Sequence, residues 1–321
     1  MPKEAAHRPR SATAVIVLGM CLALLGGLGA WLLLGRESAP PCGDLTEDPR
    51  IRKSVGEAVR PGMSCQALGE AIVNASAGDD RGNHALAQAQ ALNDVLTTLG
   101  DQEAGAVTVA PALRRPLAVA LSGYAADLHA MLGGIAVEDF VTKAAPSEPP
   151  WNPDGTNHLT VLTDTLRNVL RAIAQDPDAY ATLRLAETRT IGKRLAAVPA
   201  DAKGYSLSVP PTESARALGV LDGIADSVTH DLDENQSRQW RDAVVHRLDA
   251  GRASTEGALA ATWLDGLAGT PQAQRYELLR TQGVDMTRLW TEQRNMDNPT
   301  RQGLLAQVER SSLTAYHEVK A

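Results

Sequence analysis

The sequence predicts an all-α protein, in which one N-terminal transmembrane helix precedes a multi-helix domain with at most a short two-stranded element. Apolar residues make up 44% of the 321 residues but aromatic residues only 3%, so Ala and Leu carry most of the apolar content. Such a composition favours close-packed helices over sheets, which prefer β-branched and aromatic residues. Apolar residues also recur at helical spacing through most of the chain, and one long stretch near the N-terminus carries no charge.

The uncharged stretch covers residues 11–35, which is long enough to cross roughly 30 Å of hydrocarbon as a helix. We therefore assign residues 1–11 to a tail and residues 12–35 to a transmembrane helix that anchors the chain in a lipid bilayer. The residues expected to form this anchor include Val15, Ile16, Leu22, Leu24, Leu28, Trp31 and Leu32.

The charges that flank this helix indicate its orientation. Lys3, Arg8 and Arg10 precede it, whereas Arg36 is followed at once by Glu37. Because positively charged flanks tend to stay in the cytoplasm, the tail is expected inside and the rest of the chain outside. The prediction is a single-pass protein of the cytoplasmic membrane with an extracytoplasmic C-terminal domain.

Two other interpretations of the uncharged stretch compete with a retained anchor. A cleaved signal peptide has an apolar core of about 7 to 15 residues and a small-x-small cleavage site. This stretch is longer, and residues 37–41 after it offer no good site. Lipid attachment at Cys21 is disfavoured because Met20 is a poor preceding residue and the apolar run continues well beyond it.

The cysteines predict one disulfide. Cys21 lies inside the predicted span, which leaves Cys42 and Cys65 on the exported side. Thiols outside the cytoplasm are commonly oxidised, and each of these two has only one possible partner. We therefore expect a Cys42–Cys65 bridge, with two unpaired buried cysteines as the alternative.

Residues 36–81 are predicted to form a juxtamembrane segment of short helices tied by this bridge. Asp48-Pro49 is typical of an N-cap followed by a first-turn proline, and Ser64 is a suitable cap for a second helix. Both helices carry apolar residues on one face.

The remaining chain is predicted to form two helical lobes, residues 82–145 and 156–321. Residues 146–155 between them are rich in proline and cannot be helical, so they form the predicted linker. Residues 205–209 alternate like a short strand, for which residues 107–109 are the candidate partner.

Two Asn-His pairs are the most tempting candidates for a site. Asn83-His84 and Asn157-His158 are followed by apolar residues at identical offsets, which indicates either an old duplication or chance similarity of Ala- and Leu-rich helices. Asn is a favoured N-cap, so both pairs are expected at helix starts. Because no Cys, Glu or second-His spacing accompanies them, we predict neither a metal site nor a cofactor.

No sequence motif indicates catalysis. The chain holds no G-x-S-x-G elbow, no S-x-x-K pair and no glycine-rich phosphate loop outside the predicted span. Residues 230–235 faintly resemble a calcium loop, but Gln236 stands where glycine is required, so a helix junction is favoured. Glu187, Glu213 and Glu256 lie on predicted helices without any sign of burial.

Three tryptophans fall one per predicted helix. Trp240, Trp263 and Trp290 are interpreted as core anchors rather than as a ligand cage. Aromatic side chains of this size dominate the packing energy of a core when they are buried.

The net charge of -7 argues against a nucleic-acid partner, which would require a basic stripe. The Ala- and Arg-rich, Lys-poor composition indicates a bacterium of high GC content. The favoured function is a non-enzymatic cell-envelope protein whose ectodomain binds another envelope protein or a wall component, as part of a larger membrane assembly.

Two alternative functions stay open. A cell-wall hydrolase or transferase on a helical scaffold would require a cleft lined by a buried carboxylate. A sensor or solute-binding ectodomain would need a separate signalling partner, because the predicted cytoplasmic tail of residues 1–11 is too short to hold a signalling domain.

Overall fold

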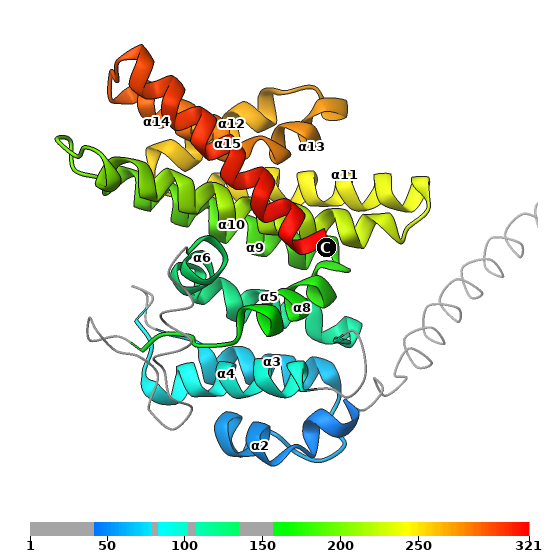
Figure 1. The fold of residues 1–321 in the computed structure, drawn as a ribbon. Helices are drawn as coiled ribbons and strands as arrows, with labels where there is room; N and C mark the ends of the chain where they lie inside the picture. The colour runs from blue at the N-terminus through cyan, green and yellow to red at the C-terminus, as the bar shows by residue number, and fades with distance from the viewer. Residues whose placement is uncertain (1–41, 79–82, 102–106, 135–156, 321) are drawn as a thin grey trace, which may run out of the picture. The chain divides into compact units, whose positions relative to one another are not determined.

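The computed structural model describes residues 42–78, 83–101, 107–134 and 157–320, and over these residues it contains helices and irregular links but no strand (Figure 1). The all-α prediction is confirmed. The α-helices are α2 (Pro49–Val55), α3 (Cys65–Ser76), α4 (Leu86–Gly100), α5 (Pro111–Gly123), α6 (Ala125–Gly133), α8 (Thr163–Ala174), α9 (Pro177–Ala196), α10 (Tyr205–His230), α11 (Glu234–Gly251), α12 (Ala258–Gly269), α13 (Gln272–Arg280), α14 (Gln282–Gln293) and α15 (Asn298–Lys320). Two short 3-10 helices accompany them, η1 (Gly43–Thr46) and η2 (Arg252–Ser254).

The first helices begin where the local sequence predicts. The Asp48 side chain accepts hydrogen bonds from the first backbone N–H groups of α2, and Pro49 occupies its first turn. The Ser64 hydroxyl accepts from the Ala67 N–H at 3.2 Å and caps α3. These side chains satisfy donors that have no partner within the helix, so the boundaries are set by local chemistry.

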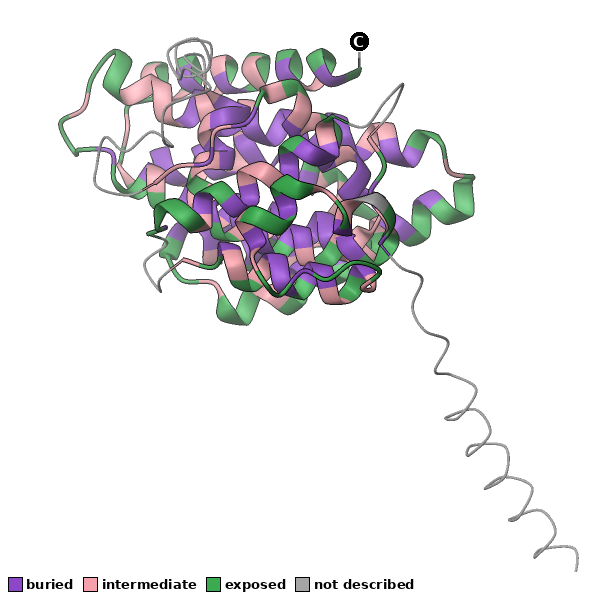
Figure 2. Cartoon of the chain, turned by 90° about the horizontal axis from the view of Figure 1, so that it is seen from below, coloured by how far each residue is buried: buried purple, intermediate pink, exposed green. Residues whose placement is uncertain are grey.

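Helices from both sides of the predicted Pro-rich linker share one core. α5 packs against α9, α6 against α10, and α4 against α8, within one compact unit that runs from Cys42 to Ala321. Most of the buried apolar residues belong to one connected cluster along these helices (Figure 2). The boundaries of the two lobes stay a prediction, because residues 146–155 lie outside the described part of the chain.

The long helix α10 is the element against which α15 packs along its length (Figure 1). Gly219 and Gly223 lie one turn apart on α10, at the contact with α15. A β-carbon at Gly219 would lie far inside van der Waals contact with the backbone carbonyl of Ser312. At Gly223 it would meet the carbonyl oxygen of Tyr316 at 2.9 Å. The absence of side chains at these two positions lets the backbones of α10 and α15 touch.

A buried arginine connects α9 with α10, α13 and α14. Arg184 on α9 is fully buried, and its Nη1 lies 2.6 Å from Oδ1 of Asp222 on α10. Its Nε donates to Gln282 and its Nη2 to the backbone carbonyl of Leu279. Burial raises the pKa of Asp222 to about 6 although Arg184 opposes this, so the pair is ionised at neutral pH.

The predicted strand at residues 205–209 is wrong, because these residues form the start of α10. A five-residue alternation is too short to exclude a helix. The helical turn brings Leu207 against the core and leads into the buried residues Pro211 and Thr212. Residues 107–109, the candidate partner strand, form an irregular link in which Val109 is buried.

The three tryptophans are buried, as predicted, with 3 to 4% of Trp240, Trp263 and Trp290 exposed. The indole N–H of Trp240 donates to the carbonyl of Ala174 at 3.0 Å, which links α11 to the end of α8. Burial therefore supports the role of all three tryptophans as core anchors, and a hydrogen bond adds to it at Trp240.

No helix among the described residues is long and apolar enough to cross a membrane. The predicted span, residues 12–35, and its anchor residues lie outside the described part of the chain. The anchor stays a prediction.

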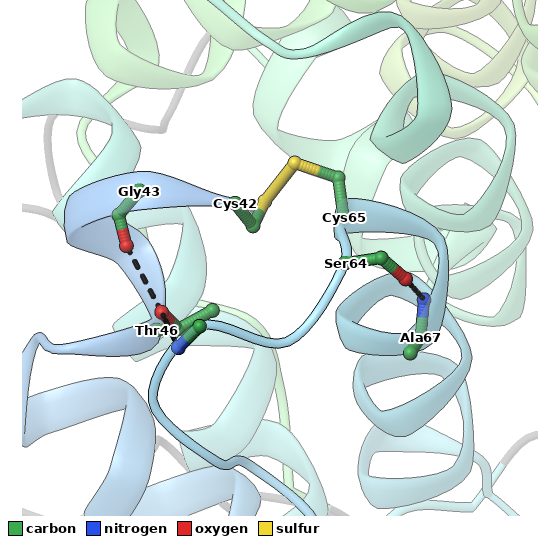
Figure 3. The surroundings of a disulfide bond; sticks show 7 residues. Cys42, Gly43, Thr46, Ser64, Cys65 and Ala67 are labelled. Atoms are coloured by element: carbon green, nitrogen blue, oxygen red, sulfur yellow. Dashed lines mark hydrogen bonds between the residues drawn. A yellow bond between two sulfur atoms is a disulfide. The ribbon is translucent and has the colours of Figure 1, made fainter. Parts of the chain in front are cut away.

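Cys42 and Cys65 are joined in a disulfide, with their Cα atoms 4.5 Å apart (Figure 3). The backbone N–H of Cys42 also donates to the carbonyl of Met63 at 3.0 Å. The Thr46 hydroxyl donates to the carbonyl of Gly43 and accepts from the N–H of Gly62. The bridge therefore closes a small folded loop that contains η1 and α2.

Replacing Cys65 by serine should lower the free energy of unfolding by about 3 kcal/mol, because the 23-residue separation gives a loop whose closure restricts the unfolded chain. Chemical denaturation of the full chain in detergent, followed by circular dichroism, measures this loss. Cys21→Ser is the matched control and should leave stability unchanged. Equal stability of the Cys65→Ser variant and the wild type would contradict the prediction.

Candidate functional site

A solvent-open groove of about 430 Å³ runs along one face of α9. Successive turns of α9 form its base, the junction of α5 and α6 forms one side, and the end of α11 with η2 forms the other. This volume falls within the range of small-molecule sites in proteins. The groove exists because α9 packs against both α5 and α11.

Three cations line the groove and no carboxylate does. Arg189 and Lys193 lie one turn apart on α9, and Arg247 lies near the end of α11. The other lining residues are small, aliphatic or hydroxyl-bearing. In a chain of net charge -7, this is a local concentration of positive charge. The arrangement suits an anion rather than a neutral or cationic ligand.

Arg189 is fixed in place by neutral acceptors. Its Nε donates to the hydroxyl of Thr255 at 3.2 Å, and its Nη2 donates to the Ser254 hydroxyl at 3.0 Å and to the Gly251 carbonyl at 3.3 Å. Burial lowers the pKa of the Arg189 guanidinium from its ordinary value, and Glu256 opposes that change. Arginine still stays charged at any ordinary pH.

The carboxylates that are buried lie elsewhere. Glu187 is 3% exposed, and its Oε1 lies 2.6 Å from Nδ1 of the fully buried His129. Sequence reasoning missed this burial, since the partner comes from α6, 58 positions earlier. The enclosed space beside Glu187 measures about 10 Å³, which is room for about one water molecule. This pair therefore has no space for a substrate.

The two Asn-His pairs do not start helices, so that expectation is wrong. α4 begins at Leu86 and α8 at Thr163. The pairs instead meet each other: the backbone and side-chain N–H groups of Asn157 donate to the carbonyl of His84 at 3.3 and 2.8 Å. The Asn157 amide thus serves as a donor to a backbone carbonyl of an irregular link, rather than as the N-cap of a helix.

The imidazoles of these pairs are engaged in packing and hydrogen bonding. His84 stacks on Tyr124 with ring centroids 3.6 Å apart, and Nδ1 of His158 lies 2.7 Å from Oδ1 of Asp127. Among the described residues, no cluster of three or more His, Cys, Asp or Glu is arranged to hold a metal ion. Residues 230–235, which faintly resemble a calcium loop, form the junction of α10 and α11. The Asp233 side chain accepts hydrogen bonds there as the N-cap of α11.

Of the residues singled out in the sequence, the structure brings together Cys42 and Cys65 and places Glu213 outside the groove, where it pairs with Arg194 at 3.1 Å. The cations of the groove were not singled out. Arg189 and Lys193 share a face of a predictable helix, but the approach of α11 with Arg247 has no local signal in the sequence.

Comparison of the chain with protein-family models, with curated proteins and with solved structures gave no match.

Proposed function

We propose that this chain is a membrane-anchored protein of a bacterial cell envelope whose extracytoplasmic helical domain binds another envelope component within a larger assembly. The disulfide between Cys42 and Cys65 carries this proposal. Disulfides persist in oxidising compartments outside the cytoplasm and are rare inside it. Cys42 follows the uncharged stretch that ends at Gly35 by only seven residues, so the bridge lies where an exported domain would begin.

The groove along α9 supports binding rather than hydrolysis. A glycan hydrolase needs two carboxylates that face each other across the cleft. The groove is lined by cations, hydroxyl groups and apolar residues, and the buried carboxylates Glu187 and Asp222 are paired with His129 and Arg184 in the core. We therefore propose a binding domain in preference to a wall-acting hydrolase.

The proposed topology predicts a defined protease pattern. In intact spheroplasts that express the full chain with an N-terminal tag, added protease should digest the large domain while the tag survives in a membrane-bound fragment. The measurement is immunoblotting of the tag before and after the membrane is broken. A large domain that resists protease until lysis would overturn the proposed location.

Introducing arginine at the centre of the proposed span tests whether residues 12–35 anchor the chain in the membrane. Val17→Arg together with Leu24→Arg should reduce membrane insertion, because each central arginine costs roughly 2.5 to 3.5 kcal/mol on insertion scales. The control pair, Arg52→Ala with Lys53→Ala, changes two exposed residues of α2 and should insert like the wild type. Undiminished insertion of the arginine pair would show that residues 12–35 are not the anchor.

A further inference from the structure

We propose that the groove along α9 is a binding site for a phosphate-bearing anion, held by Arg189, Lys193 and Arg247. This inference deepens the proposed binding function by naming the class of ligand. The evidence for it is the geometry and charge of the groove. Its test is a measurement of ligand binding, whereas the proposed topology is tested by protease digestion.

The cations of the groove differ from their neighbours in forming no close ion pair with a carboxylate of the described residues, although Glu256 acts on the Arg189 guanidinium from a greater distance. Arg194, next to Lys193 in the chain, pairs with Glu213 at 3.1 Å, and Arg252 near Arg247 pairs with Asp265 at 3.1 Å. The side chains of Lys193 and Arg247 are exposed and form no ion pair or hydrogen bond with any residue that the structure describes. Their charges are therefore available to a ligand.

Arg189 supplies a cation that is already positioned. It is half-buried. Its Nε donates to the hydroxyl of Thr255, just after η2, and its Nη2 donates to the Gly251 carbonyl at the end of α11 and to the Ser254 hydroxyl in η2. Its Nη1 donates to no described residue, although the side chain lines the groove. A fixed guanidinium loses little side-chain entropy when it binds an oxyanion, which strengthens recognition.

The threonine and serine hydroxyl groups on α9 and α5 that line the groove already donate to backbone carbonyls, so they are not available as donors to a ligand. Thr182 and Thr190 donate to the carbonyls one turn earlier in α9, at 2.8 and 3.0 Å, and Ser122 donates within α5 at 2.7 Å. Recognition therefore falls to two guanidinium groups and one ammonium group. Three positive charges on two helices favour a ligand that carries several negative charges close together, such as a chain of phosphodiesters, over a ligand with a single charge. Each phosphodiester offers two non-bridging oxygens, which can accept together from the planar fork of a guanidinium group.

Two kinds of molecule offer this chemistry: a soluble or wall-linked phosphodiester polymer and the headgroup of an anionic lipid.

Binding is measured by isothermal titration calorimetry, in which the full chain in phosphatidylcholine nanodiscs is titrated with an oligomer of glycerol phosphate of about ten units. Lys193→Glu with Arg247→Glu should weaken binding roughly 100-fold, since each lost charged contact is equivalent to about tenfold.

A matched pair separates a built site from general charge. Lys53→Glu with Arg310→Glu makes the same change in net charge on exposed residues of α2 and α15, outside the groove. This pair should bind within about threefold of the wild type, because only the overall field changes. Circular dichroism of both pairs checks that they fold. Equal losses in the two pairs would overturn the proposal.

Two further arms define the ligand. Poly-L-glutamate of equal charge should bind at least tenfold more weakly than the phosphate oligomer, and equal or tighter binding would overturn the assignment to phosphate. With phosphatidylglycerol in the nanodisc, competition that weakens oligomer binding would identify a lipid headgroup as ligand, and its absence a soluble or wall-linked phosphodiester. Failure of oligomer binding in both nanodiscs would overturn this inference and leave the proposed topology to its own protease test.

Discussion

Replacing Gly219 by alanine should lower the free energy of unfolding by about 3 kcal/mol. The new β-carbon would overlap the backbone carbonyl of Ser312, which no side-chain rotation can relieve. α15 would have to move away from α10 along a contact that spans both helices. Urea unfolding of the full chain in detergent, followed by circular dichroism, measures the loss.

The same substitution at Gly303 is the matched control. Gly303 lies on the exposed side of α15, and nothing is found within 4 Å of a β-carbon placed there. Gly303→Ala should therefore stabilise the protein by roughly 0.5 to 1 kcal/mol, the ordinary difference in helix propensity. If both variants shift the free energy of unfolding in the same direction, the prediction that Gly219 is required for the close approach of α10 and α15 is wrong.

Replacing Asp222 by alanine should destabilise the protein by about 3 to 5 kcal/mol, because it leaves the fully buried guanidinium of Arg184 without its counter-charge. Removing both partners, as Arg184→Met with Asp222→Ala, should cost less than the sum of the losses of the Arg184→Met and Asp222→Ala single variants. The measurement is a double-mutant cycle by chemical denaturation. Additive losses would show that the two residues do not act as a pair.

An exposed ion pair gives the contrast for this experiment. Arg238 and Glu234 lie one turn apart on α11, 3.2 Å from each other and well exposed to solvent. Arg238→Met should change the free energy of unfolding by at most about 0.5 kcal/mol, since exposed pairs contribute little. A loss as large as that of Asp222→Ala would indicate that burial is not the cause of the difference.

The parts of the fold that could be predicted are those with a local cause. Asp48-Pro49 and Ser64 define the starts of α2 and α3 because each supplies the acceptor that the first turn lacks. The pairing of Cys42 with Cys65 followed from the count of cysteines outside the predicted span. The helical class followed from a composition in which Ala and Leu replace β-branched and aromatic residues.

The parts that could not be predicted depend on contacts between distant segments. Residues 205–209 alternate like a strand, but the packing of Leu207 and Pro211 on the core makes them helical. Nothing in the sequence around Glu187 and Glu213 indicates that only Glu187 is buried. The burial of Glu187 follows from its contact with His129, which comes from a distant helix. The groove depends on α9 and α11 lying side by side, which no local pattern encodes.

The disulfide at the start of the folded unit has a mechanical consequence. A pull that arrives along the chain from the N-terminal side reaches the unit at Cys42, and the sulfur–sulfur bond transmits it directly to Cys65, the first residue of α3. The loop that carries η1 and α2 is thereby removed from the line of tension. Hydrogen bonds and apolar contacts that hold α2 on α4 bear none of the load while the bond is intact. Under reducing conditions the same pull would act on η1 and α2 first, because both lie between Cys42 and Cys65.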